Sequence, residues 1–179
     1  MVVVLGTNNA LELGPNSLET YITKKIIHPE YNEAMFENNI ALLRIETTPK
    51  SFPRVNEINS LCLCIPSIEK PSKRMSISGW PQKPDKLHTL DVFLLDDDEC
   101  KVYGRYFKED KMYCVGDQRG RRDPSEEDIG SPLVLTEGDQ SYLLGIVSFS
   151  IKNERTVYLK TAPYLSWIKQ QVDSNCEEA

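Results

Sequence analysis

The segment Ser125–Leu133, which reads SEEDIGSPL, determines how the rest of the chain is interpreted. Its last residue opens the short apolar run Leu133–Leu135, and such a run bounded by turn residues predicts a strand. Ile129 stands at the centre of the segment. An aliphatic side chain has no lone pair to attack a carbonyl and no proton for a base to remove. The centre of the segment therefore offers no nucleophile.

The length and the net charge of the chain limit the classes of protein to which it can belong. The chain of 179 residues suits one domain or two small lobes that share a core. Its formal net charge of −6 argues against nucleic acid or an anionic membrane as the main partner. No apolar run approaches the roughly 20 residues of a membrane span. The opening run Met1–Gly6 lacks the basic start and cleavage site of a signal peptide, so we expect no secretory leader in this sequence.

Short strands are predicted along most of the chain. In the first part they are Val2–Leu5, Tyr21–Ile27 and Asn39–Ile45, and the continuous apolar run in Asn39–Ile45 predicts a buried strand. The second part is denser, with predicted strands at Met75–Trp80, Leu90–Leu95, Lys111–Val115, Leu133–Leu135, Leu143–Phe149 and Thr156–Lys160. Strands at this spacing are typical of an antiparallel barrel or sandwich.

Two other segments complete the secondary-structure prediction. The composition of Pro66–Arg74 is typical of a linker. Pro163–Val172 predicts a helix, because proline is accepted in a first turn and because Leu165, Ile168 and Val172 share one face. The remaining residues form a polar tail.

Several motifs together resemble the trypsin-like serine proteases of the chymotrypsin fold, the peptidase S1 family. SEEDIGSPL is similar to the family's Gly-Asp-Ser-Gly-Gly-Pro-Leu, with matches at Asp128, Gly130, Pro132 and Leu133. Further similar segments follow the family's order: His28–Asn32, Asn39–Leu43, Ser78–Trp80, Met112–Gly116, Gly145–Phe149 and Val157–Tyr158 with Tyr164–Ile168. The resemblance covers nearly the whole chain.

The resemblance implies an all-β, trypsin-like double β-barrel. Residues 1–70 would form an incomplete first barrel, and residues 71–179 a complete six-stranded second barrel with a C-terminal helix. The two parts together would form one peptidase S1-like domain, in which the helix packs back across the first barrel.

The same resemblance implies that the catalytic positions are degenerate. Ile129 stands at the serine position and Asn39 at the aspartate position, and the histidine block of the family lies upstream of the strand that Val2–Leu5 resembles. An amide cannot stabilise an imidazolium as a carboxylate does, and this change alone costs about 10⁴-fold in turnover. Glu127 replaces a glycine of the oxyanion hole and would bring negative charge toward a developing oxyanion. We therefore expect no catalytic residue.

Substitute catalytic groups are few. The histidines are His28 and His88, and both are interpreted as solvated surface imidazoles. Ser131 lies past the sharp turn and is interpreted as a small packing residue. Asp128 has lost the N-terminal ammonium with which the family pairs it. Because an unpaired buried carboxylate is costly, we expect Asp128 to be exposed, or to pair with a substitute cation such as Arg121, Arg122 or Lys152.

A specificity pocket is a second possible remnant of the family. Asp123 matches the aspartate on the pocket floor of proteases that cut after Lys or Arg, and Phe149 and Ser150 would form one wall. The pocket could still hold a basic side chain. Alternatively, Asp123 is one charge in a mixed-charge surface loop.

The five cysteines suggest an oxidising compartment. The resemblance implies a disulfide between Cys100 and Cys114, worth roughly 3 kcal/mol. A second family pair is replaced at both ends, by Met75 and Leu135. The pairing of the others stays open: Cys62, Cys64 and Cys176. Neither a metal site nor a cofactor is expected, and the acidic run Asp96–Glu99 is interpreted as an exposed charge cluster.

The sequence thus predicts a non-catalytic serine protease homologue that binds protein and regulates proteolysis. The expected partner is a protease, an inhibitor or a target of the ancestral enzyme. The family resemblance implies secretion. Two alternatives remain: a serine-type endopeptidase, as family membership alone would suggest, and a truncated fragment of a longer secreted protease-like protein.

Overall fold

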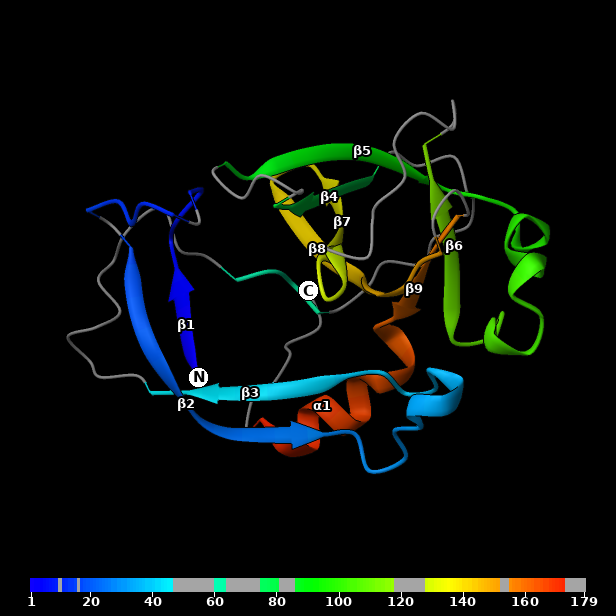
Figure 1. Cartoon of the computed structure of the whole chain (residues 1–179), viewed down its shortest axis with the longest axis horizontal. Helices are drawn as coiled ribbons and strands as arrows, with labels where there is room; N and C mark the ends of the chain where they lie inside the picture. The colour runs from blue at the N-terminus through cyan, green and yellow to red at the C-terminus, as the bar shows by residue number, and fades with distance from the viewer. Residues whose placement is uncertain are drawn as a thin grey trace.

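The chain folds into two β-rich lobes, one closed and one open (Figure 1). The computed structural model describes residues 1–9, 11–15, 17–46, 60–63, 75–80, 86–117, 128–151 and 155–172. In these ranges one sheet of three strands lies beside a closed barrel of six strands, with one short α-helix near the end of the chain. The predicted all-β architecture, with an incomplete first barrel and a complete second one, is confirmed. The predicted boundary between residues 70 and 71 and the predicted linker Pro66–Arg74 lie outside the described residues.

The open lobe is an antiparallel sheet in the order β1-β2-β3. Its strands are β1 (Val2–Leu5), β2 (Leu18–Ile27) and β3 (Ala41–Ile45). The first half of β2 pairs with β1 and the second half pairs with β3, with a register shift between Ile22 and Lys24. A bulge of this kind bends a strand and increases its twist, so one long strand serves two partners. A short 3-10 helix, η1 (Glu33–Met35), lies between β2 and β3.

The prediction that Asn39–Ile45 forms a buried strand is wrong. No residue of β3 is fully buried, and Leu43 is 47% exposed. A continuous apolar run is buried only where both faces of its sheet are covered. Among the described residues, no second sheet closes over β1–β3, so the apolar residues of β3 remain partly in contact with solvent.

The closed lobe encloses one of the two hydrophobic clusters found among the described residues. Its strands follow the barrel order β4-β5-β6-β9-β8-β7. Their bounds are β4 (Met75–Gly79), β5 (His88–Leu94), β6 (Met112–Gly116), β7 (Pro132–Glu137), β8 (Gln140–Phe149) and β9 (Thr156–Lys160). Closure leaves no free edge and encloses the inward side chains, such as Val92, Leu133 and Leu144. A 3-10 segment that the sequence did not predict, η2 (Asp97–Tyr106), connects β5 to β6.

The chain then returns to the open lobe through η4 (Ala162–Tyr164) and α1 (Leu165–Gln171). Ile168 is buried in the core, whereas Val172, expected on the same face, ends the helix and is 42% exposed. The predicted helix Pro163–Val172 therefore begins two residues before α1, within η4, and ends one residue beyond α1. Figure 1 shows α1 lying along β2 and β3. Among the described residues, no helix has the length and apolar character needed to cross a membrane.

Asn38 joins the two lobes. It is buried, with φ of 51°, and its side-chain amide donates a 2.8 Å hydrogen bond to the backbone oxygen of Glu30. Its Oδ1 accepts hydrogen bonds from the Tyr164 hydroxyl at 3.0 Å and from Lys111 Nζ at 3.2 Å. One side chain thus connects the β2–β3 loop to the start of β6 and to the segment that leads into α1.

Candidate functional site

The loop that leads into β7 is held against β8 by backbone hydrogen bonds. The Gly130 N–H donates to the Val147 oxygen at 2.9 Å, and the Val147 N–H donates to the Ser131 oxygen at 2.9 Å. A third bond, from the Ser131 N–H to the Asp128 oxygen at 2.8 Å, closes a turn. Gly130 has φ of 90°, a left-handed conformation that costs glycine little and other residues more. This turn fixes where residue 129 lies.

Ile129 occupies the turn with its side chain 53% exposed. Burial of a large aliphatic side chain stabilises the folded state, but here the side chain is exposed to solvent. The position that resembles a nucleophile position is therefore accessible but carries only carbon and hydrogen.

Asp128 lies against Gly79, the last residue of β4. A Cβ added at Gly79 would overlap the Oδ1 of Asp128 and would lie 3.3 Å from the hydroxyl oxygen of Ser131. Asp128 is half-buried rather than exposed, because its carboxylate occupies the space left by the missing side chain of Gly79. An exposed carboxylate, the first of the two alternatives expected for Asp128, is not observed. Its pairing with Arg121, Arg122 or Lys152 stays a prediction, because those cations lie outside the described residues.

Asn39, at the aspartate-like position, reaches across the lobes to β8. Its side-chain amide lies 3.3 Å from both the backbone oxygen and the hydroxyl oxygen of Ser148, which is buried. Ser148 directly follows Val147, the residue bonded to the Gly130 turn. Two consecutive residues of β8 therefore hold Asn39 and the turn that carries Ile129, two of the three positions that the family resemblance marks as degenerate. No local signal predicted this junction, because Asn39 and Ser148 are 109 residues apart.

The histidines lie in different surroundings. His28 packs edge-on against Tyr164, with ring centroids 5.4 Å apart, and against Trp167 at 5.0 Å. It is thus half-buried in the contact between β2 and α1, rather than a solvated surface imidazole as expected. His88 is exposed at the start of β5. No hydrogen bond joins the hydroxyl of Ser131 to either of these imidazoles.

The structure describes two of the three residues of the predicted specificity pocket, Phe149 and Ser150. Phe149 is 6% exposed, and the rings of Phe36 and Tyr103 pack against it with centroids 4.9 Å and 5.2 Å away. The hydroxyl of Ser150 lies 3.4 Å from that of Thr156. Asp123 and Glu127 lie outside the described residues. The remnant pocket therefore stays a prediction, with Phe149 already part of the core.

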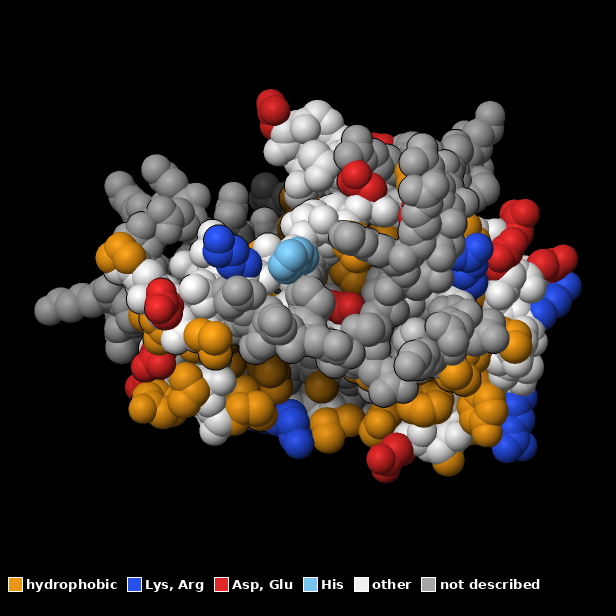
Figure 2. Space-filling view, turned by 45° about the horizontal axis from the view of Figure 1, so that its top comes forward, with side chains coloured by type: hydrophobic (Ala, Val, Ile, Leu, Met, Phe, Trp, Pro, Cys, Tyr) orange, Lys and Arg blue, Asp and Glu red, His pale blue; other side chains and the backbone are white. Residues whose placement is uncertain are grey.

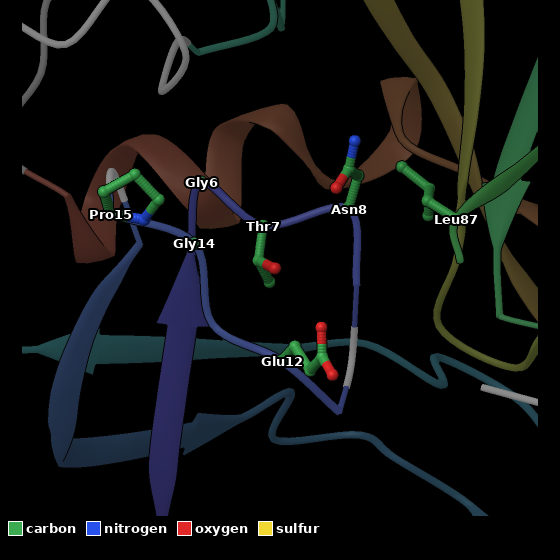
Figure 3. A pocket seen from close by; sticks show the side chains of 7 residues that line it. All are labelled: Gly6, Thr7, Asn8, Glu12, Gly14, Pro15 and Leu87. Atoms are coloured by element: carbon green, nitrogen blue, oxygen red, sulfur yellow. The ribbon is translucent and has the colours of Figure 1, made fainter. Parts of the chain in front are cut away.

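A cavity that the sequence did not indicate lies between the loop after β1 and the start of β5 (Figure 3). It has a volume of about 570 Å³ and is lined by Gly6, Thr7, Asn8, Glu12, Gly14, Pro15 and Leu87. The backbone oxygen of Asn8 accepts a 2.7 Å hydrogen bond from the Leu87 N–H, which connects the lobes at this point. Figure 3 shows Thr7 and Glu12 facing the enclosed space. One carboxylate does not make a metal site, and no metal-binding cluster occurs among the described side chains.

The cysteines follow the family pattern in part. Cys100 of η2 and Cys114 of β6 form the expected disulfide, and both are buried. Met75 and Leu135 lie in one buried cluster, so apolar packing stands where the family has a second cystine. Cys62 carries an exposed free thiol, and Cys64 and Cys176 lie outside the described residues.

Comparisons with known proteins identify the family. The family model described as Trypsin matches residues 1–168. The chain is 32% identical to human trypsin-3 over 97% of its own length and 58% of that protein, and 31% identical to rat complement factor I over 84% of the chain and 27% of the relative. It is 26% identical to mouse mannan-binding lectin serine protease 1 over 94% of the chain and 25% of the relative.

A closed six-stranded barrel beside a partial second sheet, with the Gly130 turn leading into β7, is the arrangement of a chymotrypsin-like protein. The chain belongs to the trypsin family. It spans less than two thirds of the length of the first curated relatives that it matches.

Proposed function

We propose that this chain is a non-catalytic serine protease homologue that acts by binding protein. The observation that carries the proposal is the exposed Ile129 side chain on the Gly130 turn, at the family's serine position. Acyl transfer to an enzyme needs an oxygen or sulfur nucleophile. Isoleucine supplies neither, and the neighbouring Ser131 hydroxyl makes no hydrogen bond to a described imidazole.

The remaining machinery supports the same conclusion. Asn39 presents an amide to Ser148 where the family has a carboxylate, and an amide does not stabilise an imidazolium. The family resemblance assigns Glu127 to an oxyanion-hole position, where a negative charge would oppose the developing oxyanion. Loss of a complete triad costs on the order of 10⁶-fold in turnover, and the residual rate depends largely on the oxyanion hole.

Binding without catalysis fits what the fold retains. The second barrel, the turn at Gly130 and the disulfide are intact, so surfaces that once recognised protein can persist without chemistry. The partner would be a protease, an inhibitor or a target of the ancestral enzyme. We place the protein outside the cell, because buried disulfides such as Cys100–Cys114 persist in oxidising compartments.

A fluorophosphonate probe tests the proposal, since it labels activated serine nucleophiles covalently. The full chain should remain unlabelled, while an active trypsin treated in parallel is labelled. The matched variant Ile129→Ser should also remain unlabelled, because a hydroxyl alone lacks the base and the oxyanion hole. Covalent labelling of the unmodified chain would overturn the proposal and favour a serine-type endopeptidase. The intact mass and N-terminal sequence of native material would decide whether the chain is a fragment of a longer protein.

A further inference from the structure

His88, in the first position of β5, lies directly opposite Gly79 of β4, which has no side chain. Directly opposite residues of an antiparallel pair project from the same face, with Cβ atoms about 4.5–5.5 Å apart. Two groups from the loop that leads into β7 occupy the place beside the imidazole that Gly79 leaves empty. Asp128 Oδ1 overlaps the position of the missing Cβ, and Ser131 Oγ lies 3.3 Å from that position.

These two oxygens are close to the imidazole of His88. Because Asp128 Oδ1 stands at the place of the opposite Cβ, it lies no more than about 8 Å from the Cβ of His88. His88 is exposed, so its ring can turn about χ1 toward that place, whereas Asp128 and Ser131 are half-buried. An imidazolium has two N–H donors, and the carboxylate and the hydroxyl both accept. The charged form of His88 therefore fits these partners better than the neutral form.

Among the described residues, few other charged groups lie on the elements next to His88. β4 has no charged residue, β6 pairs with the far end of β5, and Asp91 projects from the opposite face of β5. Lys86 precedes His88 in the chain, and Glu12 lies in the loop that contacts Leu87. Figure 2 shows acidic and basic side chains interspersed over one face of the molecule rather than gathered by sign. The charge nearest to His88, and not a broad field, therefore determines how it responds to pH.

We infer that His88 and Asp128 form an acid-sensitive latch, in which the imidazolium of His88 binds the carboxylate of Asp128. Asp128 belongs to the turn at Gly130, whose N–H donates to the backbone oxygen of Val147 in β8. The imidazolium attaches this turn to β5 as well, so opening the turn also requires breaking the ion pair. The latch closes as the pH falls through the range in which histidine side chains take up a proton, between about pH 8 and pH 5.

The latch regulates the surface on which the proposed binding function depends. The turn carries the exposed side chain of Ile129, so this surface is held more firmly in acid than at neutral pH. The inference uses only the strand register and the position of Asp128, and the absence of a nucleophile is not part of it. Fluorophosphonate labelling would overturn the proposed function and leave the latch intact, and a missing response to pH would do the reverse.

Native-state hydrogen exchange of the Gly130 amide in the full chain tests the latch, because it measures local opening of the turn. After correction for intrinsic exchange, protection should rise about two- to fivefold from pH 8 to pH 5.5, as expected for a partly exposed ion pair. His88→Gln and Asp128→Asn should each abolish this rise. His88→Lys, which supplies a permanent cation, should keep protection high at both pH values. The matched controls His28→Gln and Glu12→Gln should leave the rise unchanged.

An undiminished rise in His88→Gln would overturn the inference, and so would a His88→Lys variant with no added protection at pH 8. Loss of the rise in Glu12→Gln would also overturn it, because the loop after β1 would then supply the carboxylate. His88 is exposed, so its two variants should fold even if Asp128→Asn disturbs the half-buried turn. Circular dichroism spectra of the variants would verify this.

Discussion

Two apolar strands, β1 in the open lobe and β9 in the barrel, differ in how far their side chains are buried. All residues from Thr156 to Leu159 in β9 are fully buried, whereas Val2 and Val4 of β1 are 49% and 36% exposed. β9 lies between β6 and β8 in a closed barrel, and β1 has a single neighbour in the described sheet. Closure, more than the apolar character of a strand, decides how much of its surface leaves water.

The open lobe is therefore held mainly at its boundary with the rest of the molecule. His28 packs against Tyr164 and Trp167, Asn38 bonds to Tyr164 and Lys111, and Asn39 bonds to Ser148. Such contacts position the sheet but bury little of its apolar surface. We expect the two lobes to respond very differently to equivalent substitutions.

The largest expected difference is between two leucines. Leu144→Ala in β8 removes a side chain that is fully buried, and the resulting cavity should lower the free energy of unfolding by about 2–5 kcal/mol. Leu43→Ala in β3, where the leucine is 47% exposed, should cost less than about 1 kcal/mol. Urea unfolding of both variants measures the contrast. Equal losses would mean that the face of β3 is covered in solution.

The disulfide offers an intermediate effect confined to the barrel. Replacing both Cys100 and Cys114 with alanine opens a loop of 14 residues in sequence and should cost roughly 3 kcal/mol. Cys62→Ser, which changes an exposed free thiol, should leave the unfolding midpoint unchanged. A small effect of the double variant would show that the barrel is held by its core alone.

The smallest effect concerns the junction of the lobes and depends on pH. Burial, together with the smaller effect of the negative charges of Asp110 and Glu37, raises the pKa of Tyr164 to about 12. The ordinary value is about 10, so the folded state favours the neutral phenol. The resulting stability is fully present below pH 10 and is lost as the pH rises from about 10 toward 12.

Thermal unfolding measured between pH 8 and 11.5 should therefore show this loss in the unmodified chain and less of it in Tyr164→Phe. Tyr113→Phe is the comparison within the barrel, because burial also raises the pKa of Tyr113. If Tyr164→Phe leaves the alkaline loss unchanged, the phenol does not report on the junction.

Much of the fold was predictable because it depends on local pattern and on family motifs. Val2–Leu5 and Thr156–Lys160 have the predicted bounds, and the other barrel strands differ from prediction by a few residues at their ends. η2 was missed because its acidic start was interpreted as an exposed charge cluster and because Gly104, with φ of 53°, interrupts it. The burial of β3 was predicted wrongly because periodicity cannot report whether a second layer is present.

Some features of the candidate site were likewise predictable from the sequence, and others were not. The sequence gives directly the isoleucine at 129 and the asparagine at 39, the positions that the family resemblance assigns to the serine and the aspartate. That Asn39 meets Ser148, and that Asp128 fills the space at Gly79, required the folded chain. The positions of Asp123 and Glu127 remain predictions.

The amino-acid sequence by itself determined membership of the trypsin family and the absence of a nucleophilic atom at residue 129, because both depend on residue identity and order. Only the tertiary structure decided which apolar strands are enclosed, which cations face each other across β2 and β3, and which residue of β8 receives Asn39. Those features depend on contacts between segments far apart in the chain, and such contacts exist only after a sheet closes or stays open.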